Sequence, residues 1–145
     1  MRLERLNPGT VTLAAVASIS KAIHDGKFLI MSVLTGHTLT LPAAVGSNAV
    51  FYFVETVAPT SATTVIKVQN STDVMIGSLA VSATAGGTAF PTAAGSDTIT
   101  ENRTTTGGAT AGGFVELVDI APGVWNVRGV LNGSGTVATP FSSTV

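Results

Sequence analysis

Short apolar runs separated by turn residues fill the chain from residue 28 onward. Phe28 to Leu34 is one such run, and in His37 to Leu41 threonine alternates with leucine. Thr35-Gly36 lies between them, and a Gly-containing turn between two strand-like runs predicts a β-hairpin. Ala49 to Val57 is apolar at odd and even positions alike, which predicts a central strand buried on both faces. Its second face is covered either by another sheet of the chain or by another subunit.

Strand-like segments continue to the C-terminus at intervals of about 8–12 residues. They are Thr63 to Gln69, Asp73 to Ala83 with a possible bulge at Gly77, Asp97 to Glu101, Phe114 to Ile120, Val124 to Leu131 and Thr136 to Val145. Residues 84–96 and 102–113, rich in Gly, Ala and Thr, are predicted to be surface loops. About ten short strands with such turns predict an all-β fold, a single β-sandwich or barrel that is jelly-roll-like.

The clearest local prediction is a hairpin in which Phe114 to Ile120 pairs with Val124 to Leu131 around a Pro-Gly turn. Trp125 lies two residues before Val127, and extended backbone places the two side chains on one face. We therefore predict that the single tryptophan is a core residue and not a ligand platform. Arg128 is expected to pair with Glu116 across the two strands.

The N-terminus differs from the rest of the chain. Residues 1–9 contain Arg2, Glu4 and Arg5 and end in a turn signal, Asn7-Pro8-Gly9. We interpret residues 1–9 as an N-terminal arm and residues 10–145 as one β-domain. Residues 15–23 fit either one turn of helix or two periods of a strand.

Composition supports the all-β prediction and adds a statement about the surface. The 145 residues include 22 Thr, 12 Ser and 16 Gly, and only 10% are charged, against about 25% in an ordinary soluble domain. A surface of small and hydroxylic residues carries few ions to strip of water, so it is easily desolvated. This favours a protein that packs against other subunits over a monomer with a polar, uncharged surface.

Candidate chemistry is sparse. Cysteine is absent, and two histidines, four Asp and four Glu show no metal-ligand spacing. Asp97, Glu101, Glu116 and Asp119 could converge, as glycosidase chemistry requires. Asp97 and Asp119 stand at strand edges, however, where Asp commonly bonds turn backbone, and Glu116 is expected to point to solvent or to a neighbouring subunit. No serine lies in a nucleophile-elbow context. The run from Gly107 to Gly113 lacks the lysine and the following helix of a phosphate loop, and is expected to be a flexible tip. We therefore expect neither an enzyme nor a cofactor.

Net charge and hydropathy also limit the kinds of partner that the sequence predicts. The formal net charge is −1 and no basic cluster is present, so nucleic acid is not an expected partner. The apolar runs are too short to cross a bilayer. No continuous apolar segment near the N-terminus predicts a secretory signal.

Three segments resemble the small β-domain of tailed-phage structural proteins. They are Gly36 to Glu55, Ile66 to Met75 and, most strongly, Gly123 to Thr136 with Thr139-Pro140-Phe141. Together they extend over most of the chain from about Val11 onward, and the chain resembles phage head decoration, or cement, proteins. The resemblance implies a homotrimer on the capsid surface of the virion, assembled in the host cytoplasm and bound to the major capsid protein. Related β-modules occur in phage fibres, so the alternative is a receptor- or glycan-binding module of a head or tail fibre.

Two sets of residues are the candidate contacts with the capsid or with another subunit. The arm offers charged and apolar side chains, and the doubly apolar strand offers aromatic ones. The candidates are Arg2, Leu3, Arg5, Leu6, Phe51 and Phe53.

Overall fold

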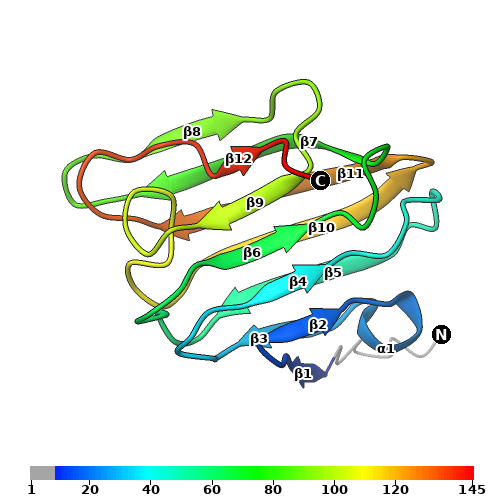
Figure 1. Cartoon of the computed structure of the whole chain (residues 1–145), viewed down its shortest axis with the longest axis horizontal. Helices are drawn as coiled ribbons and strands as arrows, with labels where there is room; N and C mark the ends of the chain where they lie inside the picture. The colour runs from blue at the N-terminus through cyan, green and yellow to red at the C-terminus, as the bar shows by residue number, and fades with distance from the viewer. Residues whose placement is uncertain (1–8) are drawn as a thin grey trace, which may run out of the picture.

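Two β-sheets face each other in the computed structural model, which describes residues 9–145 (Figure 1). The seven-stranded sheet holds, in spatial order, β1 (Thr10–Thr12), β3 (Phe28–Met31), β5 (Val50–Glu55), β10 (Phe114–Ala121), β11 (Val124–Asn132), β7 (Val74–Ser82) and β8 (Thr88–Pro91). The five-stranded sheet holds β12 (Phe141–Ser142), β9 (Thr98–Glu101), β6 (Thr64–Lys67), β4 (Thr38–Thr40) and β2 (Val16–Ser18). The predicted all-β sandwich is confirmed.

Both interpretations of residues 15–23 are partly right. The segment contains β2 and then a single helical turn, α1 (Lys21–His24). The N–H of His24 donates to the carbonyl of Ser20 at 3.0 Å, and the His24 ring accepts the N–H of Ser20 at 3.0 Å. Both the backbone and the ring of His24 therefore form hydrogen bonds within this helical turn and help to hold it.

The first six strands alternate between the sheets. β1, β3 and β5 lie side by side and parallel in one sheet, while β2, β4 and β6 do the same in the other. The chain thus winds as a coil that crosses from sheet to sheet at every connection. This arrangement differs from the hairpin-based topology expected of a jelly roll.

The predicted hairpin of residues 28–41 is therefore wrong. β3 and β4 belong to opposite sheets, and their inward side chains, Leu29 and Leu39, both lie in the core. Gly36 serves the crossing, because a Cβ there would lie 2.3 Å from the carbonyl oxygen of Thr63. Its φ of 78° lies in the region that favours glycine. Gly36 is therefore needed because its backbone approaches that of Thr63 closely, and not because it forms a hairpin turn.

The C-terminal half follows the sequence pattern more closely. β10 and β11 form the predicted hairpin, with Glu116 opposite Arg128. β11 then pairs in parallel with β7 along an unbroken register, so the structure shows no bulge at Gly77. The loop predicted over residues 84–96 contains the edge strand β8, and the predicted final strand is reduced to the two residues of β12.

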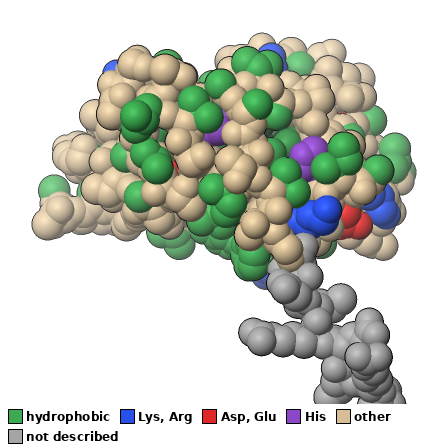
Figure 2. Space-filling view, turned by 90° about the horizontal axis from the view of Figure 1, so that it is seen from below, with side chains coloured by type: hydrophobic (Ala, Val, Ile, Leu, Met, Phe, Trp, Pro, Cys, Tyr) green, Lys and Arg blue, Asp and Glu red, His purple; other side chains and the backbone are tan. Residues whose placement is uncertain are grey.

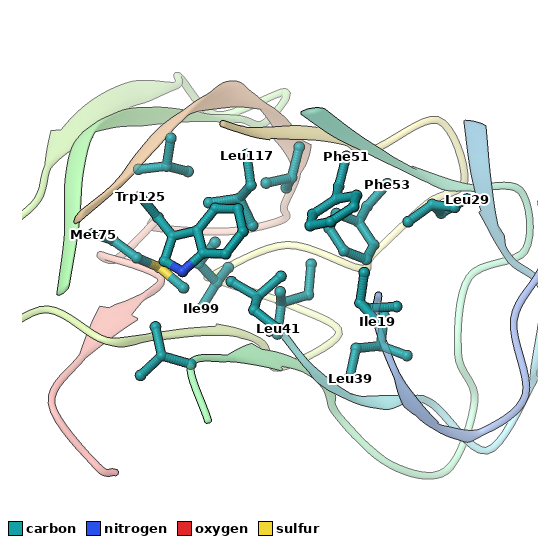
Figure 3. Packing of buried hydrophobic residues seen from close by; sticks show 14 of the residues in the cluster. Ile19, Leu29, Leu39, Leu41, Phe51, Phe53, Met75, Ile99, Leu117 and Trp125 are labelled. Carbon is teal, nitrogen blue, oxygen red and sulfur yellow. The ribbon is translucent and has the colours of Figure 1, made fainter. Parts of the chain in front are cut away.

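The core fills the space between the sheets, and the largest fully buried side chain is Trp125 (Figure 3). Its indole packs with Phe51 at a ring distance of 5.7 Å. Met75, Leu117 and Ile99 surround it from both sheets in the close-up. The prediction that Trp125 is a core residue is confirmed.

Candidate functional site

The outer surface of the seven-stranded sheet is the most distinctive surface of the described chain. Strand alternation turns every second residue of β3, β5, β10 and β11 away from the core. Most of these outward residues are apolar, and we call them the outer apolar face: Phe28, Ile30, Val50, Tyr52, Val54, Phe114, Val118 and Val130. Val130 is 47% exposed and Phe28 is 40% exposed.

Register makes this face continuous across the strands. Ile30 lies opposite Val54, Val54 opposite Phe114, and Phe114 opposite Val130. The ring of Tyr52 lies 5.6 Å from that of Phe28 and is stacked on that of Phe114 at 6.1 Å. Four strands therefore contribute to one apolar surface with an aromatic row along it.

One ion pair lies within the outer apolar face, and it is the only one found among residues 9–145. Arg128 Nε donates to Glu116 Oε1 at 2.6 Å, as the cross-strand prediction required. The arginine side chain is 72% exposed, while that of Glu116 is 10% exposed. Arg128 lies between Glu116 and Ser78 in the register of the sheet, so a partner docking here would meet an exposed guanidinium at the border of the apolar side chains.

The outer surface of the five-stranded sheet has a different chemistry. One cross-strand row consists of Ser18, Thr40, Lys67, Thr98 and Ser142. A second row consists of Val16, Thr38, Val65 and Thr100, so two of its four residues are apolar. Hydroxyl groups dominate this surface, so the two outer faces of the sandwich differ although both have few charges.

The edge at β1, β2 and α1 also carries few charges. Figure 2 shows hydrophobic side chains scattered among uncharged polar ones, with small groups of basic and acidic residues. Val16 and Ile23 are exposed in this region of the chain. The low charge predicted from composition therefore extends to this edge.

The six predicted contact residues divide into two groups. Arg2, Leu3, Arg5 and Leu6 lie outside the described residues. Phe51 and Phe53 are 0% exposed, because they occupy the inward positions of β5 and pack in the core. Their selection as contacts is wrong. The second apolar face of the strand consists of their neighbours Val50, Tyr52 and Val54.

Asp119 is a structural anchor at one end of the sandwich. Its carboxylate accepts the N–H groups of Val45, Gly46 and Ser47 at 2.7–3.2 Å and the Ser47 hydroxyl at 2.7 Å. Burial alone would raise the pKa of this carboxyl, but the Ser47 hydroxyl and the three N–H donors hold it below its usual range. The charge of Asp119 therefore fixes the loop that precedes β5.

Asp97 has the same role near the C-terminus. It accepts the N–H of Thr144 at 2.9 Å and that of Val145 at 3.3 Å, and the Thr98 hydroxyl at 2.7 Å. Burial opposes ionisation, but these donors lower the pKa of the Asp97 carboxyl. Asp97 thereby fastens the last residues of the chain.

The four acidic residues considered for convergence in the sequence analysis, Asp97, Glu101, Glu116 and Asp119, do not come together. Asp97 and Asp119 hold separate segments, and Glu116 lies on the outer apolar face. Glu101 instead faces a residue that the sequence analysis did not select, Glu55. Alternation indicates that Glu55 shares a strand face with Phe51 and Phe53, but only the structure shows that this face points inward.

Glu55 and Glu101 form a buried carboxyl pair, contributed by opposite sheets. Both residues are 1% exposed, and as charged groups none of their four carboxyl oxygens has a hydrogen-bond donor. Burial, followed by the hydrogen bond and the charge of Glu55, raises the pKa of the Glu101 carboxyl well above its usual range. Thr64, opposite Glu101 in the β6–β9 register, also has a buried hydroxyl without a partner.

A metal-ligand cluster and a membrane-spanning helix are both absent from residues 9–145. Within this part of the chain, no three histidine or acidic side chains gather so as to hold a metal ion. No described helix has the length and apolarity needed to cross a membrane. Comparison with protein-family models, curated proteins and solved structures finds no match to this chain.

Proposed function

We propose that this chain is a structural virion protein that binds the outer surface of a phage capsid and stabilises the shell by bridging major capsid proteins. The observation that carries the proposal is the outer apolar face, which four strands build and in which Phe28 and Val130 are exposed. Removing such a surface from water favours association by about 25 cal/mol per Å². The resemblance of the C-terminal hairpin to phage decoration proteins supplies the identity of the partner.

Low charge makes the same surface suitable for tight docking. Uncharged side chains lose little hydration free energy when a partner covers them. Arg128 is the exposed charge on the face, so an acidic group on the capsid protein would complement it. Together these features support a mainly apolar interface with one charged contact.

Capsid co-sedimentation tests the proposal. The protein is mixed with capsids assembled from the major capsid protein of the same genome, and its bound fraction is measured. Val130→Glu places a charge on the outer apolar face and should lower occupancy at least tenfold. The matched control is Thr38→Glu, which places the same charge on the exposed outer surface of the five-stranded sheet and should leave occupancy unchanged. Equal binding by both variants, at wild-type melting temperature, would refute the proposed contact.

The proposed assembly is a homotrimer, as the resemblance implies. Light scattering of the free protein and its symmetry on the capsid measure this directly. If Val130→Glu leaves the trimer intact and abolishes capsid binding, the face contacts the capsid. If the trimer dissociates, the face is a subunit interface and the capsid contact lies elsewhere.

A glycan-binding fibre module is the second candidate, and the aromatic row favours it. Phe28, Tyr52 and Phe114 could stack against sugar rings. Their neighbours Ile30, Val54 and Val130 offer no hydrogen bonds to sugar hydroxyls, which weakens this alternative. Binding to a glycan array that is lost in Tyr52→Ala, without capsid binding, would support it over the capsid role.

A further inference from the structure

Glu55 and Glu101 occupy a place in the fold where two negative charges are not tolerated. Each projects inward from its sheet, so the two carboxyl groups meet across the sandwich instead of side by side on one strand pair. Leu131 lies against the glycines of the neighbouring segment, and Met31 is the register partner of Glu55. These neighbours are apolar and buried, so they offer no donor.

Charged side chains on the surrounding elements do not compensate the pair. β3, β4 and β12 carry no titratable residue, and His37, which precedes β4, places its ring nitrogens at the N–H of Val33 and the carbonyl of Ala14. Glu116 and Arg128 pair with each other on the outer apolar face, and Lys67 lies on the outer surface of the five-stranded sheet. Asp97 and Asp119 have their own donors away from the pair. Arg103 donates through Nη1 to the carbonyl of Thr60 at 2.6 Å, and its buried Nε has no hydrogen-bond partner.

We infer that Glu55 and Glu101 share one proton in the folded protein, and that release of this proton to solvent loosens the segment of residues 102–113 that closes this end of the sandwich. A carboxylic acid can donate to a carboxylate, whereas two carboxylates have no donor between them. Like-charged carboxyls in contact resist double ionisation for the same reason. One proton thus converts two buried groups without donors into a hydrogen-bonded pair.

The closing segment is attached directly to the pair. The N–H of Gly112 donates to the carbonyl of Glu55 at 2.7 Å, and the N–H of Glu55 donates to the carbonyl of Gly113 at 2.9 Å. Gly107 lies over Glu101, because a Cβ there would be 3.2 Å from Glu101 Cγ. The predicted flexible tip is therefore an ordered cover with little apolar side chain of its own. Such a segment is the part of this end that opens at least cost.

The sign of the pH dependence follows from the raised pKa of Glu101. The folded state holds a proton that the unfolded chain releases near the ordinary value of 4.5. Stability is therefore fully present below that pH and is lost as the pH rises toward the folded pKa. The folding equilibrium constant should fall by up to tenfold per pH unit in this window.

Urea unfolding between pH 5 and 9 tests the inference on the whole chain. Wild type should lose stability as the pH rises, whereas Glu101→Gln should have a flat profile, because its amide donates to Glu55 without titrating. Glu55→Gln is the reciprocal variant and should behave in the same way if Glu101→Gln does not fold. The matched control, Glu116→Gln, removes a carboxyl from the outer apolar face and should retain the wild-type slope. An equal slope in wild type and Glu101→Gln would overturn the inference.

Two measurements locate the proton and the opening. Carboxyl carbon NMR of Glu-labelled wild type should show one glutamate titrating well above the others, and Glu101→Gln should lose that signal. Amide exchange at Ala109 and Gly112 should be faster in wild type than in Glu101→Gln at pH 8, where intrinsic exchange is equal. Ordinary titration of every glutamate would overturn the shared proton. So would a gain in wild-type melting temperature on adding Ca²⁺ or Zn²⁺ that Glu101→Gln lacks, since a metal would then occupy the pair.

Discussion

The two ends of the sandwich bury acidic side chains in opposite ways. Near the start of β5, Asp119 is surrounded by backbone N–H groups and a hydroxyl, so its charge is stabilised by short hydrogen bonds. At the other end of the same strand, Glu55 meets Glu101 with no donor in place. All three residues are 1% exposed, but Glu101 lies deep in the core whereas Asp119 lies near the surface. The difference teaches that donors and depth together decide whether a buried carboxyl stabilises this fold.

The largest effect on stability is expected at the end that holds Asp119, whose carboxylate accepts several hydrogen bonds. Asp119→Ala removes the acceptor for three N–H groups and the Ser47 hydroxyl, and leaves these donors buried. We expect the free energy of unfolding to fall by about 3–5 kcal/mol. Urea unfolding at pH 7 measures this change. A loss below about 1 kcal/mol would show that the loop over residues 45–47 is held by other contacts.

Replacing the carboxyl groups of Glu55 and Glu101 at the other end should increase the stability of the protein. Glu55→Met with Glu101→Met fills similar volume without charge, and exchanging buried unpartnered charge for apolar side chains is often stabilising. We expect the double variant to gain about 1–4 kcal/mol at pH 7 and less at pH 5. The melting temperature at the two pH values checks both statements. A destabilised double variant at both pH values would remove the contrast between the ends.

Lowering the pH should destabilise the end of the sandwich that holds Asp119 and not the end that holds Glu55 and Glu101. The pKa of Asp119 is held low by its donors, so its contribution is present above the ordinary value of 3.8 and is lost as the pH falls below it. Asp97 adds a contribution of the same sign. Asp119→Asn should therefore lose less stability than wild type between pH 5 and pH 2. Thermal unfolding over this range measures the difference, and identical acid profiles would contradict it.

Local pairing was predictable from the sequence, whereas contacts between the sheets were not. The β10–β11 hairpin fixes its own register through a short turn, so the Glu116–Arg128 pair and the inward position of Trp125 followed from alternation. Apolar and polar residues alternate in the same way in two strands of a hairpin and in two strands that lie in opposite sheets. The pattern therefore predicts that β3 and β4 pair, whereas they lie in different sheets. β5 is apolar on both faces, so the pattern did not show whether Phe51 or Tyr52 points inward.

The carboxyl pair also shows that the sequence predicts features within one strand but not contacts between distant strands. The sequence pattern places Glu55 on one strand face with Phe51 and Phe53, but it does not show that this face points inward. Its partner Glu101 belongs to the opposite sheet, and nothing in the local pattern says which carboxyl it meets. The position of Asp119 at a strand edge predicts that its carboxylate bonds turn backbone, but it does not show that the donors come from residues 45–47.

The smallest expected effect compares one hydroxyl from each end. The Ser47 hydroxyl donates to Asp119 at 2.7 Å, whereas the Thr64 hydroxyl is buried without a partner beside Glu101. Ser47→Ala should cost about 1.5–3 kcal/mol, because a hydrogen bond to a charged group is lost. Thr64→Val keeps the shape and removes a polar group without a hydrogen bond, so it should gain up to about 1 kcal/mol. Urea unfolding of both variants at pH 5, where the carboxyl pair holds its proton, measures the contrast. A loss of stability in Thr64→Val would mean that this hydroxyl donates to the pair, and that the second end is better satisfied than its geometry indicates.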